Sequence, residues 1–234
     1  MQQSSSIIFG IHSVQELIST RPEAADRIYI AEGKRSSQLF ALLKECRRLR
    51  LPYHVVPENK LRDIGKTTKH QGVVAQCPAR PYVPLETLLD TAQQSDAPGL
   101  FVVPASVQDP RNLGSILRSC AAFGVDGVLV EKAHTSPLSD TVAKSAAGML
   151  EHVDVCRPRS LESALKTIKT EGFSVVGANA ASGTPPSACT LSGPVVLVMG
   201  GEHRGLPPYL ARLCDQTVRI PLNPQAESLN VSVA

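Results

Sequence analysis

The pattern that most restricts the fold is a series of short, uninterrupted apolar runs separated by amphipathic segments. In residues 195–199 five apolar side chains follow one another without alternation, as expected for a strand covered on both faces. Similar runs are found at residues 100–103, 127–130 and 173–178. The rest of the pattern predicts helices at residues 111–123, 139–149, 161–171 and 208–213, and a last strand at 217–222. This alternation predicts an α/β domain with a mainly parallel sheet.

A smaller alternating unit precedes that domain. Its apolar runs predict strands at residues 27–31, 54–56 and 72–77, and its helical spacing predicts helices at 37–50 and 58–65. The first part of the chain is therefore expected to form a small α/β domain of its own.

A proline-rich stretch separates the two patterns. Pro78, Pro81 and Pro84 can continue neither a helix nor a central strand, so a semi-rigid linker is expected here. We predict a small domain at residues 1–77, a linker region at 78–95 and a large domain at 96–234.

Positive charge is concentrated in the first third of the chain, although the net charge is only +3. The basic residues there are Lys34, Arg35, Lys44, Arg47, Arg48, Arg50, Lys60, Arg62, Lys66 and Lys69. Such a cluster is typical of a phosphate-binding surface, and a solvated helix face explains it equally well. The few aromatic residues and the absence of Trp disfavour a surface that holds single strands by base stacking.

Several other functions are disfavoured by missing motifs. There is no G-x-G-x-x-G after the first strand of the large domain, no P-loop and no G-x-S-x-G elbow. The six cysteines and six histidines show no metal-ligand spacing, so we expect free, packed thiols and no metal. The polar first residues lack a signal peptide's basic region, and no run of about 18 apolar residues exists, so a cytoplasmic location is expected.

Three segments of the large domain carry chemistry-bearing residues. The first, residues 108–119, follows a strand and opens a helix, with Asp109 as the expected N-cap and Pro110 at the first helical position. It places Arg111, Ser115 and Arg118 on one stripe, opposite the apolar one. A capped surface helix with solvated arginines is the plainer interpretation.

The second segment, residues 195–206, runs from a buried strand into a glycine-rich turn that contains Glu202 and His203. Glycines at the carboxyl end of a parallel strand let a ligand approach the backbone closely, although a tight turn alone also explains them. The third segment, residues 220–234, combines proline bends with Ser228, Leu229 and Asn230. An ordinary loop before a helix is its plainer interpretation.

Together and in this order, the three segments closely resemble the motifs of the SpoU/TrmH branch of the SPOUT methyltransferases. The matching residues are Asp-Pro-Arg-Asn-Leu-Gly at 109–114 with Arg118, Gly-Gly-Glu-His-Arg-Gly-Leu at 200–206, and Ile-Pro at 220–221 with Ser-Leu-Asn-Val-Ser at 228–232. Residues 9–14 and 70–75 likewise resemble the ends of the small RNA-binding domain fused to such enzymes. The resemblance covers nearly the whole chain.

The resemblance implies a trefoil-knotted α/β domain that binds S-adenosylmethionine, with active sites at a homodimer interface. Matched to the motifs, Gly200, Ile220 and Leu229 would contact the cofactor. The residues expected around the reacting ribose are Asn112, Arg118, Glu202, Ser228 and Asn230. Because a guanidinium stays protonated, we expect Arg118 to orient a phosphate and stabilise developing negative charge rather than act as a base.

The implied reaction is methyl transfer to a ribose 2′-hydroxyl of RNA, with a guanosine of 23S rRNA as the expected substrate. Two alternatives stay open: a 2′-O-methyltransferase of tRNA or another rRNA site, and an RNA-binding or ribosome-assembly protein without catalytic activity. In the family a further helix follows the last motif, whereas the sequence given stops at Ala234.

Overall fold

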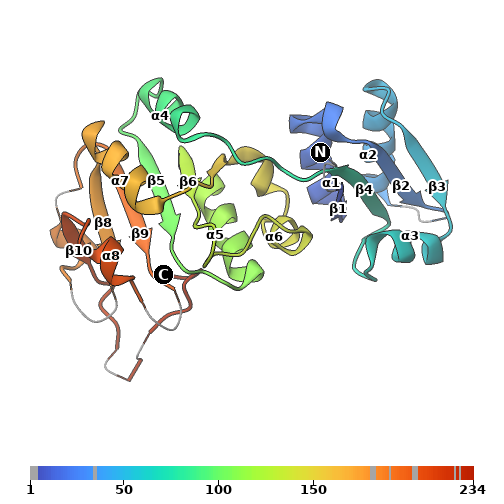
Figure 1. The fold of residues 1–234 in the computed structure, drawn as a ribbon. Coiled ribbons are helices and arrows are strands. Elements are labelled where there is room, and N and C mark those ends of the chain that lie inside the picture. Colours follow the sequence, from blue (N-terminus) through green and yellow to red (C-terminus); the bar gives the residue numbers. More distant parts are fainter. Residues whose placement is uncertain are drawn as a thin grey trace. The chain divides into compact units, whose positions relative to one another are not determined.

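A computed structural model describes residues 5–33, 36–179, 183–189, 191–201, 205–223, 225–226 and 228–234. The chain divides into two compact units, whose elements are labelled in Figure 1. Unit 1 comprises Met1–Arg80 and Leu138–His152, and unit 2 comprises Pro81–Pro137 and Val153–Ala234.

Unit 1 is built on a four-stranded sheet in the order β1-β4-β2-β3. Strands β1 (Ser5–Phe9) and β2 (Arg27–Ala31) pair antiparallel with β4 (Val73–Pro78), and β3 (Tyr53–Val56) pairs parallel with β2 at the sheet edge. The helices of this part are α1 (Ile11–Thr20), α2 (Ser37–Arg48) and α3 (Glu58–Gly65), with a 3-10 turn at Pro22–Ala24.

Alternating residues of these strands separate two small cores. Ile28 and Ile30 of β2 pack with apolar residues of α1 and α2, whereas Ala31 packs with Leu61 of α3. Because side chains alternate between the two faces of a strand, α1 and α2 cover one face and α3 covers the other. The side chain of Ser36 accepts a hydrogen bond from the backbone N–H of Leu39 and so caps α2.

Residues 138–152 belong to unit 1 although they lie far along the sequence. They form α6 (Asp140–Ser145) and a 3-10 turn at Met149–His152. The carboxylate of Glu151, whose side chain is 3% exposed, pairs with Arg21 at 2.5 Å and with Arg80 at 3.2 Å. The two guanidinium groups compensate the buried carboxylate for the hydration that it loses.

Unit 2 contains a six-stranded sheet in the order β10-β8-β9-β5-β6-β7, and every neighbouring pair is parallel. Its strands are β5 (Leu100–Pro104), β6 (Gly127–Leu129), β7 (Val155–Cys156), β8 (Ser174–Ala178), β9 (Val195–Met199) and β10 (Gln216–Val218). Its helices are α4 (Leu85–Gln93), α5 (Pro110–Ala122), α7 (Leu161–Thr170) and α8 (Pro208–Ala211), with a 3-10 turn at Pro186–Ala188.

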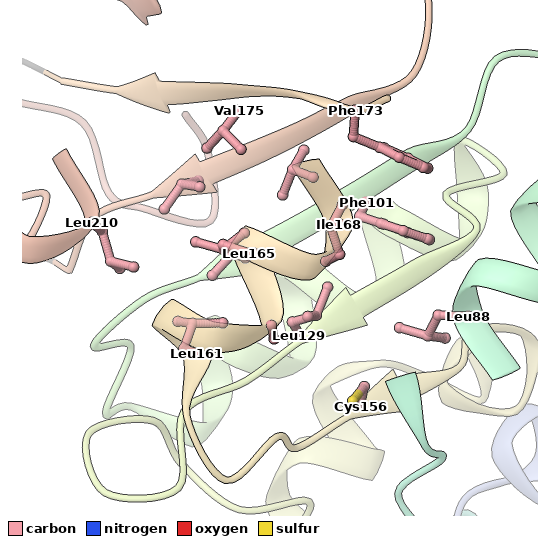
Figure 2. Packing of buried hydrophobic residues seen from close by; sticks show 14 of the residues in the cluster. Leu88, Phe101, Leu129, Cys156, Leu161, Leu165, Ile168, Phe173, Val175 and Leu210 are labelled. Carbon is pink, nitrogen blue, oxygen red and sulfur yellow. The ribbon is translucent and has the colours of Figure 1, made fainter. Parts of the chain in front are cut away.

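The main core of unit 2 lies between the sheet and helices α4, α7 and α8 (Figure 2). The rings of Phe101 and Phe173 stack with their centroids 4.8 Å apart, and Leu165 of α7 is fully buried against them. Helix α5 packs on β5 and β6 through other buried residues, among them Leu113 and Leu117. The expected α/β architecture with a parallel sheet is confirmed.

The structure differs from the sequence-based expectation in several elements, and the strand expected at 217–222 comprises only Gln216–Val218. Strand β1, helix α1, helix α4 and strand β7 were not predicted. Helix α4 falls within the segment 78–95 that we expected to be a linker, and residues 138–152 join the first unit rather than the second. The helix expected at 139–149 ends at Ser145, because Ala147 and Gly148 adopt left-handed backbone conformations with φ of 51° and 90°.

All six cysteines are free, as expected, and Cys46, Cys77, Cys120 and Cys156 are buried. Burial raises the pKa of the Cys120 thiol to about 12. These residues therefore pack as small apolar side chains.

Candidate active site

A cavity of about 300 Å³ opens at the carboxyl ends of three strands in unit 2. Ala178, Met199 and Val218, at the ends of β8, β9 and β10, form its floor. The remainder of the lining comes from Asn179, from the glycine turn after β9 and from the C-terminal segment, namely Gly200, Gly201, Gly205, Ile220, Leu222, Ser228, Leu229, Val231 and Ala234. Open parallel sheets bind ligands at such strand ends.

The glycine turn after β9 is closed by two backbone hydrogen bonds. The N–H of Gly201 donates to the carbonyl of Gly205 at 3.1 Å, and the N–H of Gly205 donates back at 3.0 Å. A Cβ atom on Gly200 would lie 2.2 Å from the carbonyl carbon of Gly205, so only glycine fits there. The turn was therefore predicted correctly, but Glu202 and His203 lie outside the described residues.

Helix α5 begins as the sequence indicates. The Asp109 carboxylate accepts a hydrogen bond from the backbone N–H of Arg111 at 2.8 Å, and Pro110 occupies the first helical position. The Arg111 guanidinium also pairs with Asp109 at 2.7 Å, and this hydrogen bonding lowers the pKa of the Asp109 carboxyl. Arg111 therefore stabilises the start of the helix.

The first and third motifs meet at two asparagines that are 118 residues apart. The side-chain amide of Asn230 donates to the Oδ1 atom of Asn112 at 3.3 Å. The Oδ1 atom of Asn230 accepts from the backbone N–H of Ser232 at 2.8 Å and from its hydroxyl at 2.7 Å. These bonds fix which side of the Asn230 amide faces Asn112.

A buried carboxylate that we did not predict supports this region from below. Glu131 accepts hydrogen bonds from the backbone N–H of Ser106 at 3.2 Å and from the hydroxyl of Tyr209. Burial, together with the bond to Glu131, raises the pKa of the Tyr209 hydroxyl well above its ordinary value. Only an acidic residue directly after an apolar strand signals this position in the sequence.

Glu131 thereby holds the loop on which the glycine turn rests. Ser106 has a φ of 59°, and its carbonyl oxygen would lie 2.7 Å from a Cβ atom on Gly201. The backbone N–H of Ala105 donates to the carbonyl of Met199 at 2.8 Å. The loop after β5 and the turn after β9 are thus held together.

Arg118 is not among the residues that line the cavity. Its side chain is exposed and makes no hydrogen bond or ion pair with the described residues. Arg118 follows Asn112 by six positions, which places it about 9 Å further along the helix axis and on a different face. Within one chain, the structure brings together Gly200, Ile220, Ser228 and Leu229 at the cavity but leaves Arg118 outside.

The described part of the chain contains neither a candidate metal site nor a candidate membrane-spanning helix. No group of three or more His, Cys, Asp or Glu residues there is placed to hold a metal ion. No helix in the same ranges is long and apolar enough to cross a membrane.

Comparison with known families gives two matches that together span most of the chain. Residues 99–234 match the SpoU rRNA Methylase family, and residues 7–83 match a family described as RNA 2′-O ribose methyltransferase substrate binding. The range of the substrate-binding family ends within the proline-rich stretch, and the range of the methylase family begins after it.

Curated relatives are similar over nearly their whole length. A putative TrmH family tRNA/rRNA methyltransferase of Staphylococcus haemolyticus is 32% identical over 97% of this chain and 91% of that protein. The 23S rRNA (guanosine-2′-O-)-methyltransferase RlmB of Shewanella oneidensis is 31% identical over 99% of this chain and 94% of that protein.

Solved structures share the fold. The SpoU methyltransferase AviRb from Streptomyces viridochromogenes, solved in complex with AdoMet, superposes with a TM-score of 0.81 at 22% identity, covering 98% of this chain and 86% of that one. An AdoMet-bound rRNA methyltransferase from Sinorhizobium meliloti gives a TM-score of 0.78 at 25% identity, covering 98% and 83%.

Proposed function

Because the chain belongs to the SpoU rRNA methylase family of S-adenosylmethionine-dependent RNA methyltransferases, we propose that it methylates the ribose 2′-hydroxyl of a guanosine in 23S rRNA. The observation that carries this proposal is the cavity, which the second and third motifs form together and beside which Asn230 bonds to Asn112. The relative RlmB, similar over the full chain, supports the choice of nucleotide and RNA.

The cavity residues fit the proposed cofactor. Gly200 leaves its backbone open to a ligand, and a Cβ atom there would collide with the turn. Ile220 and Leu229 add apolar surface to the cavity wall, as is common in small-molecule sites. These three residues would hold S-adenosylmethionine, whose sulfonium supplies an electrophilic methyl group when it is bound.

The remaining residues would position the acceptor. The bonded side chains of Asn112 and Asn230 would orient the ribose, and Ser228 at the cavity wall would hold the last loop against it. Holding the two reactants in line removes much of the entropic barrier to transfer. By its place in the second motif, Glu202 would help to orient the ribose.

Arg118 fits this scheme if a second copy of the chain supplies it. Its exposed guanidinium would bind an RNA phosphate and stabilise negative charge on the 2′-oxygen as the proton leaves to water or a phosphate oxygen. We therefore propose a homodimer whose active site combines the cavity of one subunit with Arg118 of the other.

Unit 1 would bind the RNA, because it includes the region that matches the substrate-binding family and the basic cluster. The proposed place of action is the cytoplasm. A tRNA or another rRNA site is the second candidate, since the staphylococcal relative is described as a tRNA/rRNA methyltransferase.

The test uses the purified protein with tritium-labelled S-adenosylmethionine and separate unmodified 23S rRNA, 16S rRNA and tRNA. After nuclease digestion, we expect labelled 2′-O-methylguanosine from 23S rRNA alone. Label in tRNA or 16S rRNA would replace the proposed substrate, and label on a base would refute ribose methylation. Absence of label from every RNA, with intact cofactor binding, would favour a protein without catalytic activity.

A further inference from the structure

Unit 1 carries an apolar groove of about 670 Å³ that the proposed reaction does not use. It lies between helix α2 and the ends of strands β2 and β3 (labelled in Figure 1), and its walls include Ile30, Leu39, Phe40, Leu43 and Val55. Gly33, Ser36 and Ser37 also line it.

Two side chains in this groove are unusually exposed for their type. Phe40 is 70% exposed and Val55 is 57% exposed, and they are the exposed large hydrophobic residues in the described part of unit 1. Two such side chains lining the same groove indicate a binding surface rather than scattered surface residues.

Basic side chains continue the groove along α2. Lys44 and Arg47 follow Phe40 at helical spacings of four and seven, so all three share one face, and both basic residues are exposed. Arg47 donates a hydrogen bond to the hydroxyl of Tyr53 at 3.1 Å, with its guanidinium carbon 6.0 Å from the ring centroid. Tyr53 lies two residues before Val55, on the same face of the edge strand.

We propose that this groove receives one unpaired nucleobase of the RNA substrate, stacked on Phe40, with the adjacent phosphates beside Lys44 and Arg47. The inference rests on the proposed RNA substrate and adds where and how unit 1 holds it. A nucleotide combines a flat apolar base with a negatively charged phosphate, so it matches an exposed aromatic ring with cations on one side.

The charge of the region favours RNA over a protein partner. Basic residues clearly outnumber acidic ones between residues 36 and 80, and on α2 the single acidic residue, Glu45, is paired with Arg48. The chain has few aromatic residues, and in this groove only Phe40 is aromatic among the lining residues. The groove therefore suits a single base projecting from a loop or bulge, and a continuous duplex keeps its bases stacked inside.

The experiment measures binding of two RNAs by fluorescence anisotropy, using the full chain. One RNA is a hairpin with an unpaired loop taken from the RNA that the protein methylates, and the other is a fully paired duplex of the same length. Phe40→Ala is expected to weaken hairpin binding about tenfold and to leave duplex binding unchanged. Phe40→Tyr should restore hairpin affinity, whereas Phe40→Leu should not, because leucine keeps the apolar contact but loses the stacking face.

Charge variants provide a matched pair. Lys44→Ala should weaken hairpin binding and reduce the slope of log affinity against log salt by about 1. Lys60→Ala removes the same charge from α3, on the opposite face of the sheet, and should leave the slope for the hairpin nearer to the wild-type value.

Three results would overturn the groove proposal. The first is that Phe40→Ala binds the hairpin as tightly as the wild type. The second is that Phe40→Leu and Phe40→Tyr bind the hairpin with equal affinity. The third is that Phe40→Ala loses self-association in ultracentrifugation while its RNA affinity is unchanged. If the wild-type protein methylates RNA while any of these holds, only the groove assignment fails. If the wild-type protein binds and methylates no RNA, the proposed function itself fails.

Discussion

Substitution of Gly200 by alanine is the sharpest test of the proposed cofactor site. The new Cβ atom would lie 2.2 Å from the carbonyl carbon of Gly205 and 2.3 Å from the amide nitrogen of Leu206, whereas real Cβ contacts essentially never fall below 3.0 Å. The turn must therefore open by about 0.8 Å, because both colliding atoms are backbone and cannot rotate away. This displacement moves the cavity wall that the ligand would contact.

The expected loss can be estimated from the contacts at stake. One backbone hydrogen bond and part of an apolar wall are each worth about 1 kcal/mol, so together their loss weakens binding roughly thirtyfold. Isothermal titration calorimetry with S-adenosylmethionine measures this change directly. Overpacking should also lower the free energy of unfolding by about 1–3 kcal/mol, which thermal unfolding would report as a lower Tm.

Gly127→Ala is the matched control. Its Cβ atom would lie 2.7 Å from the Leu88 side chain, inside the same unit but away from the cavity. We expect a lower Tm with unchanged cofactor affinity. If Gly200→Ala binds S-adenosylmethionine as tightly as the wild type, or if both glycine variants lose affinity equally, the cavity is not the cofactor site.

Three further predictions concern Glu131, Arg118 and Asp109. Glu131→Gln should lower the free energy of unfolding by about 1–3 kcal/mol, because the new amide cannot accept hydrogen bonds from both Ser106 and Tyr209. Tyr209→Phe should lower the free energy of unfolding by less. Equal Tm values for the wild type and Glu131→Gln would contradict this reasoning. Arg118→Ala should abolish RNA methylation and leave calorimetric cofactor affinity intact, and methylation at the parent rate would remove Arg118 from the mechanism. The pKa of the Asp109 carboxyl is lowered in the folded protein, so the ionised carboxylate stabilises the fold at pH values above the usual aspartate pKa. This stabilisation is lost as the pH falls through the lowered pKa. Asp109→Asn keeps an N-cap but does not titrate, so its difference in Tm from the wild type should shrink in acid, and a difference independent of pH would refute the assignment.

Much of the fold could be predicted from periodicity. Strands 27–31 and 195–199 and helix 58–65 were predicted to the residue, because an uninterrupted apolar run or a clear helical spacing marks each one. Helix α4 was missed because nearby prolines suggested a linker, although Leu85, Leu88, Leu89 and Ala92 have the three- and four-residue spacing of a buried helix face. Its packing depends on Gly127, which is distant in sequence and leaves room for Leu88.

In the candidate site, too, features marked by a local motif could be predicted, whereas features that depend on residues distant in sequence could not. The motifs indicated that Gly200, Ile220 and Leu229 would share a cavity, and the structure places all three in its lining. The support from Glu131 and Tyr209 could not be predicted, because it depends on the order of strands in the sheet and on where α8 packs. The roles of the site residues remain predictions until they are measured.

In the proposed active site, the glycine turn and the last loop hold the methyl donor beside the asparagine pair. The most direct measurement is a crystal structure of the full chain with S-adenosylhomocysteine bound. We expect the ligand to contact the backbone at Gly200, Ile220 and Leu229, with Asn112 and Asn230 facing its sulfur side. Ligand density elsewhere on the protein, with this cavity closed or filled by side chains, would contradict it.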